Sequence, residues 1–110
     1  MDSKSYSKGV FDMTITKKRD GNKMNVIIEG RLDTGTTPEA EKELKGSLDD
    51  ITELTLDFSK LDYISSAGLR LLLSLQKTMN TRGSMKILHP NDVVKEIFEV
   101  TGFSDILTVE

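Results

Sequence analysis

The sequence predicts a single α/β domain, in which helices cover a mixed β-sheet that begins with an antiparallel hairpin and continues with parallel strands. Three observations lead to this prediction. The chain has 110 residues, 36% of them hydrophobic, which is enough for one apolar core. Residues 11–17 alternate apolar and polar residues with the period of two that is typical of strands, and a second strand-like segment follows closely at residues 24–28. After them, helix-like and strand-like segments take turns, and this order requires parallel crossovers.

The amino-terminal part is expected to hold a tail and the hairpin. Residues 1–9 are polar and rich in small side chains, so we expect a flexible tail, followed by one folded domain over residues 10–110. Alternation over residues 11–17 predicts the first strand, and residues 24–28 predict the second. The sequence DGN at residues 20–22 is a turn signal, and its short length joins the two strands as an antiparallel hairpin.

A turn-rich segment and the first helix follow the hairpin. Residues 30–37 read GRLDTGTT, and Thr37 is expected to cap a helix with Pro38 at its first position. Apolar residues recur every four positions to form the buried stripe of this helix: Ala40, Leu44 and Leu48.

The third strand follows the first helix. It is predicted by the alternation over residues 53–58, and a short loop comes after it.

Two more helices and a short strand complete the pattern. Residues 67–81 are expected to form the central helix, because their leucines cover a far wider arc than the ~100° stripe of a surface helix. Residues 85–88 predict a strand, Asn91 an N-cap, and Gly102 a left-handed helix stop. Residues 106–109 form a last strand-like apolar fragment. The buried face of the third helix is expected to hold Val93, Val94, Ile97 and Phe98.

The composition excludes several classes of function. The chain has no cysteine and a single histidine, His89, so we expect no disulfide, no metal site and no cofactor. A net charge of -3 without any basic block argues against a nucleic-acid partner. The longest apolar runs are far shorter than the ~20 residues of a membrane span, so we expect a cytoplasmic protein with no membrane contact.

The segment that is most informative about function joins the third strand to the central helix. It spans residues 61–70 and contains Ser65 and Ser66 where the helix begins. One interpretation is structural, with either serine accepting a hydrogen bond from the first turn as an N-cap. The other is a phosphorylation site, because unpaired amide groups and the helix dipole favour an anion at this position. Gly68 suits both interpretations, since a glycine in the first turn lets another backbone or a partner approach closely.

Residues 63–73, with the sequence YISSAGLRLLL, resemble the signature of the STAS domain, which is the fold of bacterial anti-sigma factor antagonists. The similarity extends over nearly the whole chain from residue 11. It includes the Gly-x-Leu-Asp turn at residues 30–33, the Asp-Phe pair at 57–58 and the Thr-Gly-Phe stop at 101–103. This resemblance implies a STAS-like fold and a regulatory protein that is not an enzyme.

The resemblance also implies partner switching. Ser66 matches the serine that, in the family, is phosphorylated by a partner that is both a serine kinase and an anti-sigma factor, and Ser65 is the second choice. The unmodified protein would bind this kinase and free a sigma factor, phosphorylation would break the complex, and a metal-dependent serine phosphatase would reset it. The expected partner-binding residues are Asp33, Ser65, Ser66, Ala67, Gly68 and Arg70.

Three positions qualify this expectation. Ser65 stands where many members carry aspartate, so a local acidic contact is missing and Ser65 stays the alternative modified residue. Arg31 stands where glutamate is frequent, which would change the partner that is recognised. Asp33 either faces the partner or is a loop carboxylate that accepts hydrogen bonds from nearby backbone.

Three other functions compete with partner switching. Asp57 ends a strand as the acceptor of a receiver domain does, but basic residues follow the first strand, where a receiver holds magnesium with an acidic pair. Ser66 lacks the preceding glycine of a nucleophile elbow, and His89 lies at the end of a different strand, which disfavours an enzyme. A scaffold or ligand-sensing module of the same fold, whose serines are never modified, stays open.

Overall fold

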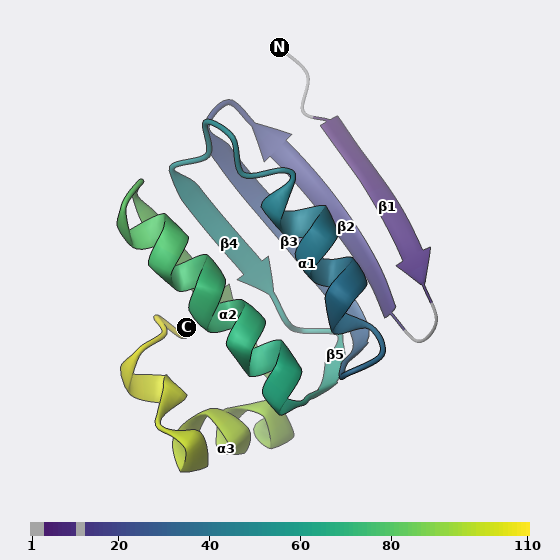
Figure 1. The fold of residues 1–110 in the computed structure, drawn as a ribbon, viewed down its shortest axis with the longest axis vertical. Coiled ribbons are helices and arrows are strands. Elements are labelled where there is room, and N and C mark those ends of the chain that lie inside the picture. The colour runs from purple at the N-terminus through teal and green to yellow at the C-terminus, as the bar shows by residue number, and fades with distance from the viewer. Residues whose placement is uncertain (1–3, 11–12) are drawn as a thin grey trace.

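The computed structural model describes the backbone of residues 4–10 and all of residues 13–110, and it shows α1 and α2 packed against one face of a mixed sheet (Figure 1). The strands are β1 (Lys4–Val10), β2 (Met13–Asp20), β3 (Lys23–Leu32), β4 (Glu53–Asp57), β5 (Leu61–Ile64) and β6 (Ser84–Leu88). The helices are α1 (Thr37–Lys45), α2 (Ser66–Asn80) and α3 (Asp92–Thr101), with a 3-10 turn at Phe103–Asp105. The predicted α/β class is therefore confirmed.

The sheet has the strand order β1-β2-β3-β4-β6, and β5 pairs with the last residues of β3. The pairs β1–β2 and β2–β3 are antiparallel, whereas β3–β4, β3–β5 and β4–β6 are parallel. This confirms the predicted hairpin followed by parallel strands. Because β3 and β5 run in parallel, with Leu32 opposite Ile64, their carboxyl ends lie side by side. The loops that leave these two ends therefore begin close together.

The amino-terminal segment differs from the prediction. The backbone of Lys4–Val10 forms β1, with Ser7 opposite Thr16 of β2, so residues 4–9 are not the expected tail. The sequence KSYSKGV gave no apolar alternation, but antiparallel pairing uses backbone groups and does not require one. Residues 1–3 lie outside the described residues, and so do residues 11–12, where the first predicted strand begins.

Three local predictions near the site are also corrected. Residues 61–64 were expected in a loop but form β5, because Leu61 and Ile64 are buried. The N-cap of α1 is Thr36 rather than Thr37, and α1 ends before Leu48, which is nevertheless buried. Helix α2 begins at Ser66, one residue earlier than expected, and ends at Asn80.

The core lies between α1, α2 and the face of the sheet that they cover (Figure 1). The wide apolar arc of α2 is confirmed, since Leu69, Leu71, Leu72, Leu75 and Met79 are all buried. A helix buried over so wide an arc has little freedom to move, so its first turn is held rigidly relative to the sheet.

A buried lysine joins α1 to β2. Lys17 is only 4% exposed, and its Nζ donates to Glu43 Oε1 at 2.9 Å and to Ser47 Oγ at 2.6 Å. The charge of Lys17 is thus neutralised by a carboxylate at the end of α1, and this ion pair fixes the position of the helix.

The carboxyl-terminal region follows the prediction at its two helix ends. Asn91 caps α3, with its Oδ1 accepting from Val94 N at 2.8 Å, and Gly102 ends the helix with φ of 81°, in the left-handed region. Val93 is 53% exposed, so its predicted burial is wrong. The fragment at 106–109 makes one bridge to the sheet, between Val109 and Ile87, rather than a strand.

Candidate partner-binding site

The predicted site residues come together where β3 and β5 end and α2 begins. The Ser65 amide donates to Leu32 O at 2.8 Å, which links the start of α2 to the end of β3. Gly68 is buried against the same strand end. A Cβ added at Gly68 would lie 2.6 Å from Ile64 Cγ1 and 3.1 Å from Leu32 O. Only glycine allows this approach, and the approach brings the two serines next to the loop that begins at Asp33.

The two serines have different positions in the helix start. Ser65 is the N-cap of α2, with extended backbone angles (φ -98°, ψ 178°), whereas Ser66 is the first helical residue and is exposed. The predicted N-cap is confirmed in position but not in bonding. Ser65 makes no side-chain cap hydrogen bond, and its Oγ is buried without a partner. No acidic residue lies in the first turn of α2 either, so no side chain of this helix compensates the positive end of its dipole.

Asp33 organises its own loop. Its Oδ1 accepts from the Gly35 amide at 2.9 Å and the Thr36 amide at 3.0 Å, and its Oδ2 accepts from Arg31 Nε at 3.4 Å. The hydrogen bond from the Thr36 backbone lowers the pKa of Asp33 most strongly; desolvation opposes this, and the Arg31 side chain and the Gly35 amide assist it. The Asp33 carboxylate therefore accepts hydrogen bonds from nearby backbone, as the structural interpretation predicted. Its side chain remains 29% exposed at the edge of the site.

Arg31 is held in place by two neighbours. Its guanidinium lies 4.7 Å from the centre of the Tyr63 ring and also pairs with Asp33. Tyr63 was not predicted as a site residue. It faces Arg31 because the two are opposite each other in the β3–β5 register, and that pairing could not be predicted while residues 61–64 were expected to be a loop.

A hollow of about 310 Å³ lies between α1 and α2 beside the serines. On the α2 side the hollow is lined by Ala67, Arg70, Leu71 and Ser74. Ala67, Arg70 and Ser74 are spaced three and four residues apart, so they lie on one face of the helix. From the α1 side the hollow is lined by Thr37 and Glu41 among others, and Thr37 is 6% exposed with an Oγ1 that has no hydrogen-bond partner. The predicted residues Ala67 and Arg70 therefore border a cavity, which the sequence did not indicate.

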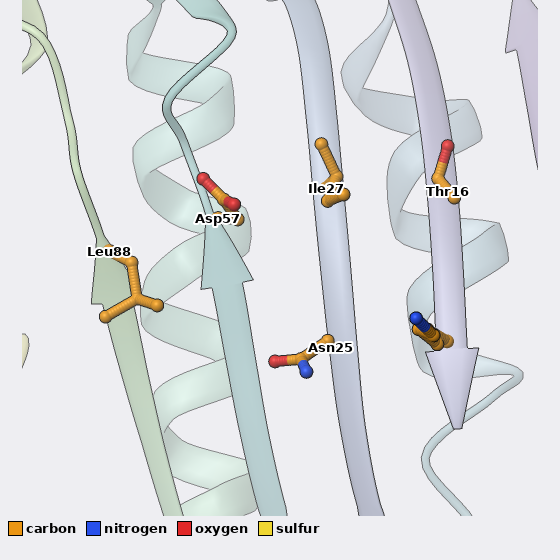
Figure 2. A pocket seen from close by; sticks show the side chains of 6 residues that line it. Thr16, Asn25, Ile27, Asp57 and Leu88 are labelled. Carbon is orange, nitrogen blue, oxygen red and sulfur yellow. The ribbon is translucent and has the colours of Figure 1, made fainter. Parts of the chain in front are cut away.

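The opposite face of the sheet carries a second hollow, of about 380 Å³. Figure 2 shows Thr16, Asn25, Ile27, Asp57 and Leu88 on this face, with the helices behind the strands. Asp57 accepts from the Ser59 amide at 2.9 Å, as expected of a strand-end carboxylate that bonds to the following loop. Within residues 13–110, where side chains are described, no three His, Cys, Asp or Glu side chains are grouped to hold a metal ion.

No helix in the described part of the chain has the length and the apolar character that crossing a membrane requires.

Comparison with known proteins identifies the same fold. The family model described as the STAS domain matches residues 14–110. The anti-sigma-B factor antagonist of Staphylococcus aureus is 31% identical over 86 residues, which cover 76% of this chain and 80% of that protein. Its name describes a regulatory role rather than an enzymatic one.

Solved structures agree with this match. An anti-sigma factor antagonist from Mycobacterium paratuberculosis has a TM-score of 0.80 at 17% identity, covering 88% of this chain and 84% of that one. The anti-sigma factor antagonist SpoIIAA in its unphosphorylated form has a TM-score of 0.76 at 16% identity, covering 87% of each chain. The Bacillus SpoIIAA in its phosphorylated form has a TM-score of 0.69 at 15% identity, covering 87% and 90%.

Proposed function

The chain belongs to the STAS domain family, and from this premise we propose that it is an anti-sigma factor antagonist that switches partners through phosphorylation of Ser66. In the proposed cycle, the unmodified protein binds an anti-sigma factor that is also a serine kinase. Phosphorylation releases the protein, and a metal-dependent serine phosphatase restores it. The protein itself needs no cofactor, and it acts in the cytoplasm, where sigma factors work.

The observation that carries this proposal is the position of Ser66. Its side chain is exposed as the first residue of α2, so a kinase can reach it without unfolding the helix. Ser65, the second choice, has its Oγ buried under the helix start and would have to be exposed first. The kinase would transfer the γ-phosphoryl group of ATP to Ser66 Oγ, with loss of the hydroxyl proton and release of ADP.

The physical effect of the phosphate explains the release. Phosphorylation adds about -1.5 to -2 charges at the centre of the proposed contact surface. A nucleotide-binding kinase carries phosphates or carboxylates close to its substrate, so the added dianion would be repelled and its desolvation would weaken the complex. Asp33, which already lies at the edge of this surface, would add to the repulsion.

Mass spectrometry after incubation with ATP and extract of the native host tests the modification. We expect phosphate on Ser66 of the parent protein and none on the Ser66→Ala variant. Ser65→Ala is the matched control and should still be modified. Phosphate on Ser65 alone would show that Ser65 rather than Ser66 is the modified residue. If an active extract modifies neither serine, the result would favour the scaffold or ligand-sensing module whose serines are never modified.

Binding to the kinase isolated from that extract tests the switch itself. Ser66→Ala should bind with the affinity of the unmodified protein, and Ser66→Asp should bind at least about tenfold more weakly, because one negative charge enters the contact. Equal binding of the two variants would remove Ser66 from the contact surface and contradict the proposal.

A further inference from the structure

Arg70 differs from the other arginines in having no hydrogen-bond or ion-pair partner among the residues that the structure describes. In the described part of the chain, Arg19 donates to Gly21 O, Arg31 pairs with Asp33, and Arg82 donates to Leu48 O at 2.6 Å. Within the same residues, the exposed guanidinium of Arg70 makes no hydrogen bond and no ion pair. An unpaired arginine at the centre of a proposed contact surface is available to bind an anion.

Ser66 and Arg70 lie four residues apart on α2, and both are exposed. Side chains at positions i and i+4 lie on the same side of a helix, one turn apart, so a group on Ser66 is within reach of the Arg70 side chain. Arg70 also borders the hollow between α1 and α2, which gives the guanidinium space to turn. Glu41, the carboxylate on the opposite wall, is paired with Lys45 at 3.1 Å.

The first turn of α2 provides the second part of an anion site. The N-cap makes no side-chain hydrogen bond, and the turn contains no acidic residue, whereas α1 has Glu39 and α3 has Asp92 at the equivalent place. A phosphate on Ser66 would therefore meet the positive end of the helix from one side and Arg70 from the other.

We propose that Arg70 binds the phosphate of phosphorylated Ser66 within the same chain. This inference rests on the proposed function, because it assumes that Ser66 is the modified residue. If Arg70 binds the phosphate, one phosphorylation event changes the contact surface in two ways. It adds a dianion at Ser66, and it removes the positive charge of Arg70 from any carboxylate of the partner.

The test uses the full chain with phosphoserine incorporated at position 66 during translation, so no kinase is needed. The ³¹P signal is titrated with pH in the parent protein and in Arg70→Gln. Lys77→Gln is the matched control, because it removes the same charge from an exposed position of the same helix. Circular dichroism verifies that each variant is folded.

We expect Arg70→Gln to raise the midpoint of the phosphate titration by about 0.5 pH unit at low salt, because the dianion loses its nearby cation. Lys77→Gln should change the midpoint by less than about 0.1 pH unit. Arg70→Lys, which keeps the charge, should have a midpoint close to that of the parent protein. Equal midpoints for Arg70→Gln and Lys77→Gln would overturn the pairing. Failure of the proposed function would instead be seen in the phosphosite map, which this titration does not involve.

Discussion

Replacing Gly68 by alanine should destabilise the protein and disturb the site together. The new Cβ would lie 2.6 Å from Ile64 Cγ1 and 3.1 Å from both Leu32 Cβ and Leu32 O. Carbon atoms pack at about 3.5 to 4.0 Å, so the start of α2 and the end of β5 would have to separate by roughly 1 Å. Ile64 is 1% exposed and Leu32 is fully buried, so neither side chain has space to move aside.

The size of the effect follows from two opposing contributions. Overpacking in a core costs about 1–3 kcal/mol, and alanine recovers about 0.8–1.0 kcal/mol of helix propensity relative to glycine. The net loss should be about 1 kcal/mol, which lowers the Tm of a domain of this size by about 5 °C. Thermal and urea unfolding followed by circular dichroism measure this loss, and the phosphorylation rate of Ser66 in the same variant reports the displacement of the helix start.

A glycine in the neighbouring loop between β3 and α1 provides the control for Gly68→Ala. A Cβ at Gly35 would meet only Asp33 Oδ1, at the ordinary distance of 3.5 Å, so Gly35→Ala should leave the stability nearly unchanged. If Gly68→Ala were as stable as Gly35→Ala and were phosphorylated at the parent rate, the close approach of α2 to β3 would not be what positions the serines.

The remaining predictions concern the supports around the site. Lys17→Met should cost about 3 kcal/mol in urea unfolding because it removes the cation that pairs with Glu43, and the added change Glu43→Leu should recover most of it; a double variant as unstable as the single one would contradict this account. Asn91→Ala should cost about 1–2 kcal/mol because it removes both the cap of α3 and the hydrogen bond to Leu61 O, with Asn91→Asp intermediate; equal melting temperatures for these two variants would count against the cap. The lowered pKa of Asp33 means that its ionised form contributes stability above its unfolded pKa and loses that contribution as the pH falls through the folded value. Unfolding measured from neutral pH to below about pH 4 should therefore show the advantage of the parent over Asp33→Asn disappearing in acid, and a pH-independent difference would refute it.

The parts of the fold that were predictable are those in which burial imposes a pattern on the sequence. β2 and β3 alternate because one face of each is buried, and α2 carries its wide leucine arc because neighbours cover it on several sides. β1 and β5 were missed for physical reasons. β1 pairs through its backbone with a polar sequence, and β5 has four residues, too few to establish a period.

The helix start that carries the candidate site was predictable from the sequence, but the interactions around it were not. Two serines before a leucine-rich segment indicated a helix start, and the structure places that start within one residue. The internal hydrogen bonds of Asp33 and the stacking of Arg31 on Tyr63 depend on how the loop after β3 closes and on the β3–β5 register. Neither is encoded in a local sequence period, so only the folded structure reveals them.

The geometry of the helix start is compatible with the proposed switch operating without refolding. Ser66 projects from a turn whose backbone is held by Gly68 and by the Ser65 amide on Leu32, and the Ser66 side chain takes part in none of these supporting contacts. A phosphate added there would leave the supports intact and, as an anion at the amino end of a helix, would stabilise α2 rather than break it. In family members with aspartate at the position of Ser65, a second negative charge would oppose this stabilisation, whereas in this chain the neutral Ser65 leaves Arg70 as the nearest charged residue along α2. Phosphorylation of this protein would therefore act on the partner's side of the contact, by repulsion and by engaging Arg70, while the fold that presents Ser66 stays the same.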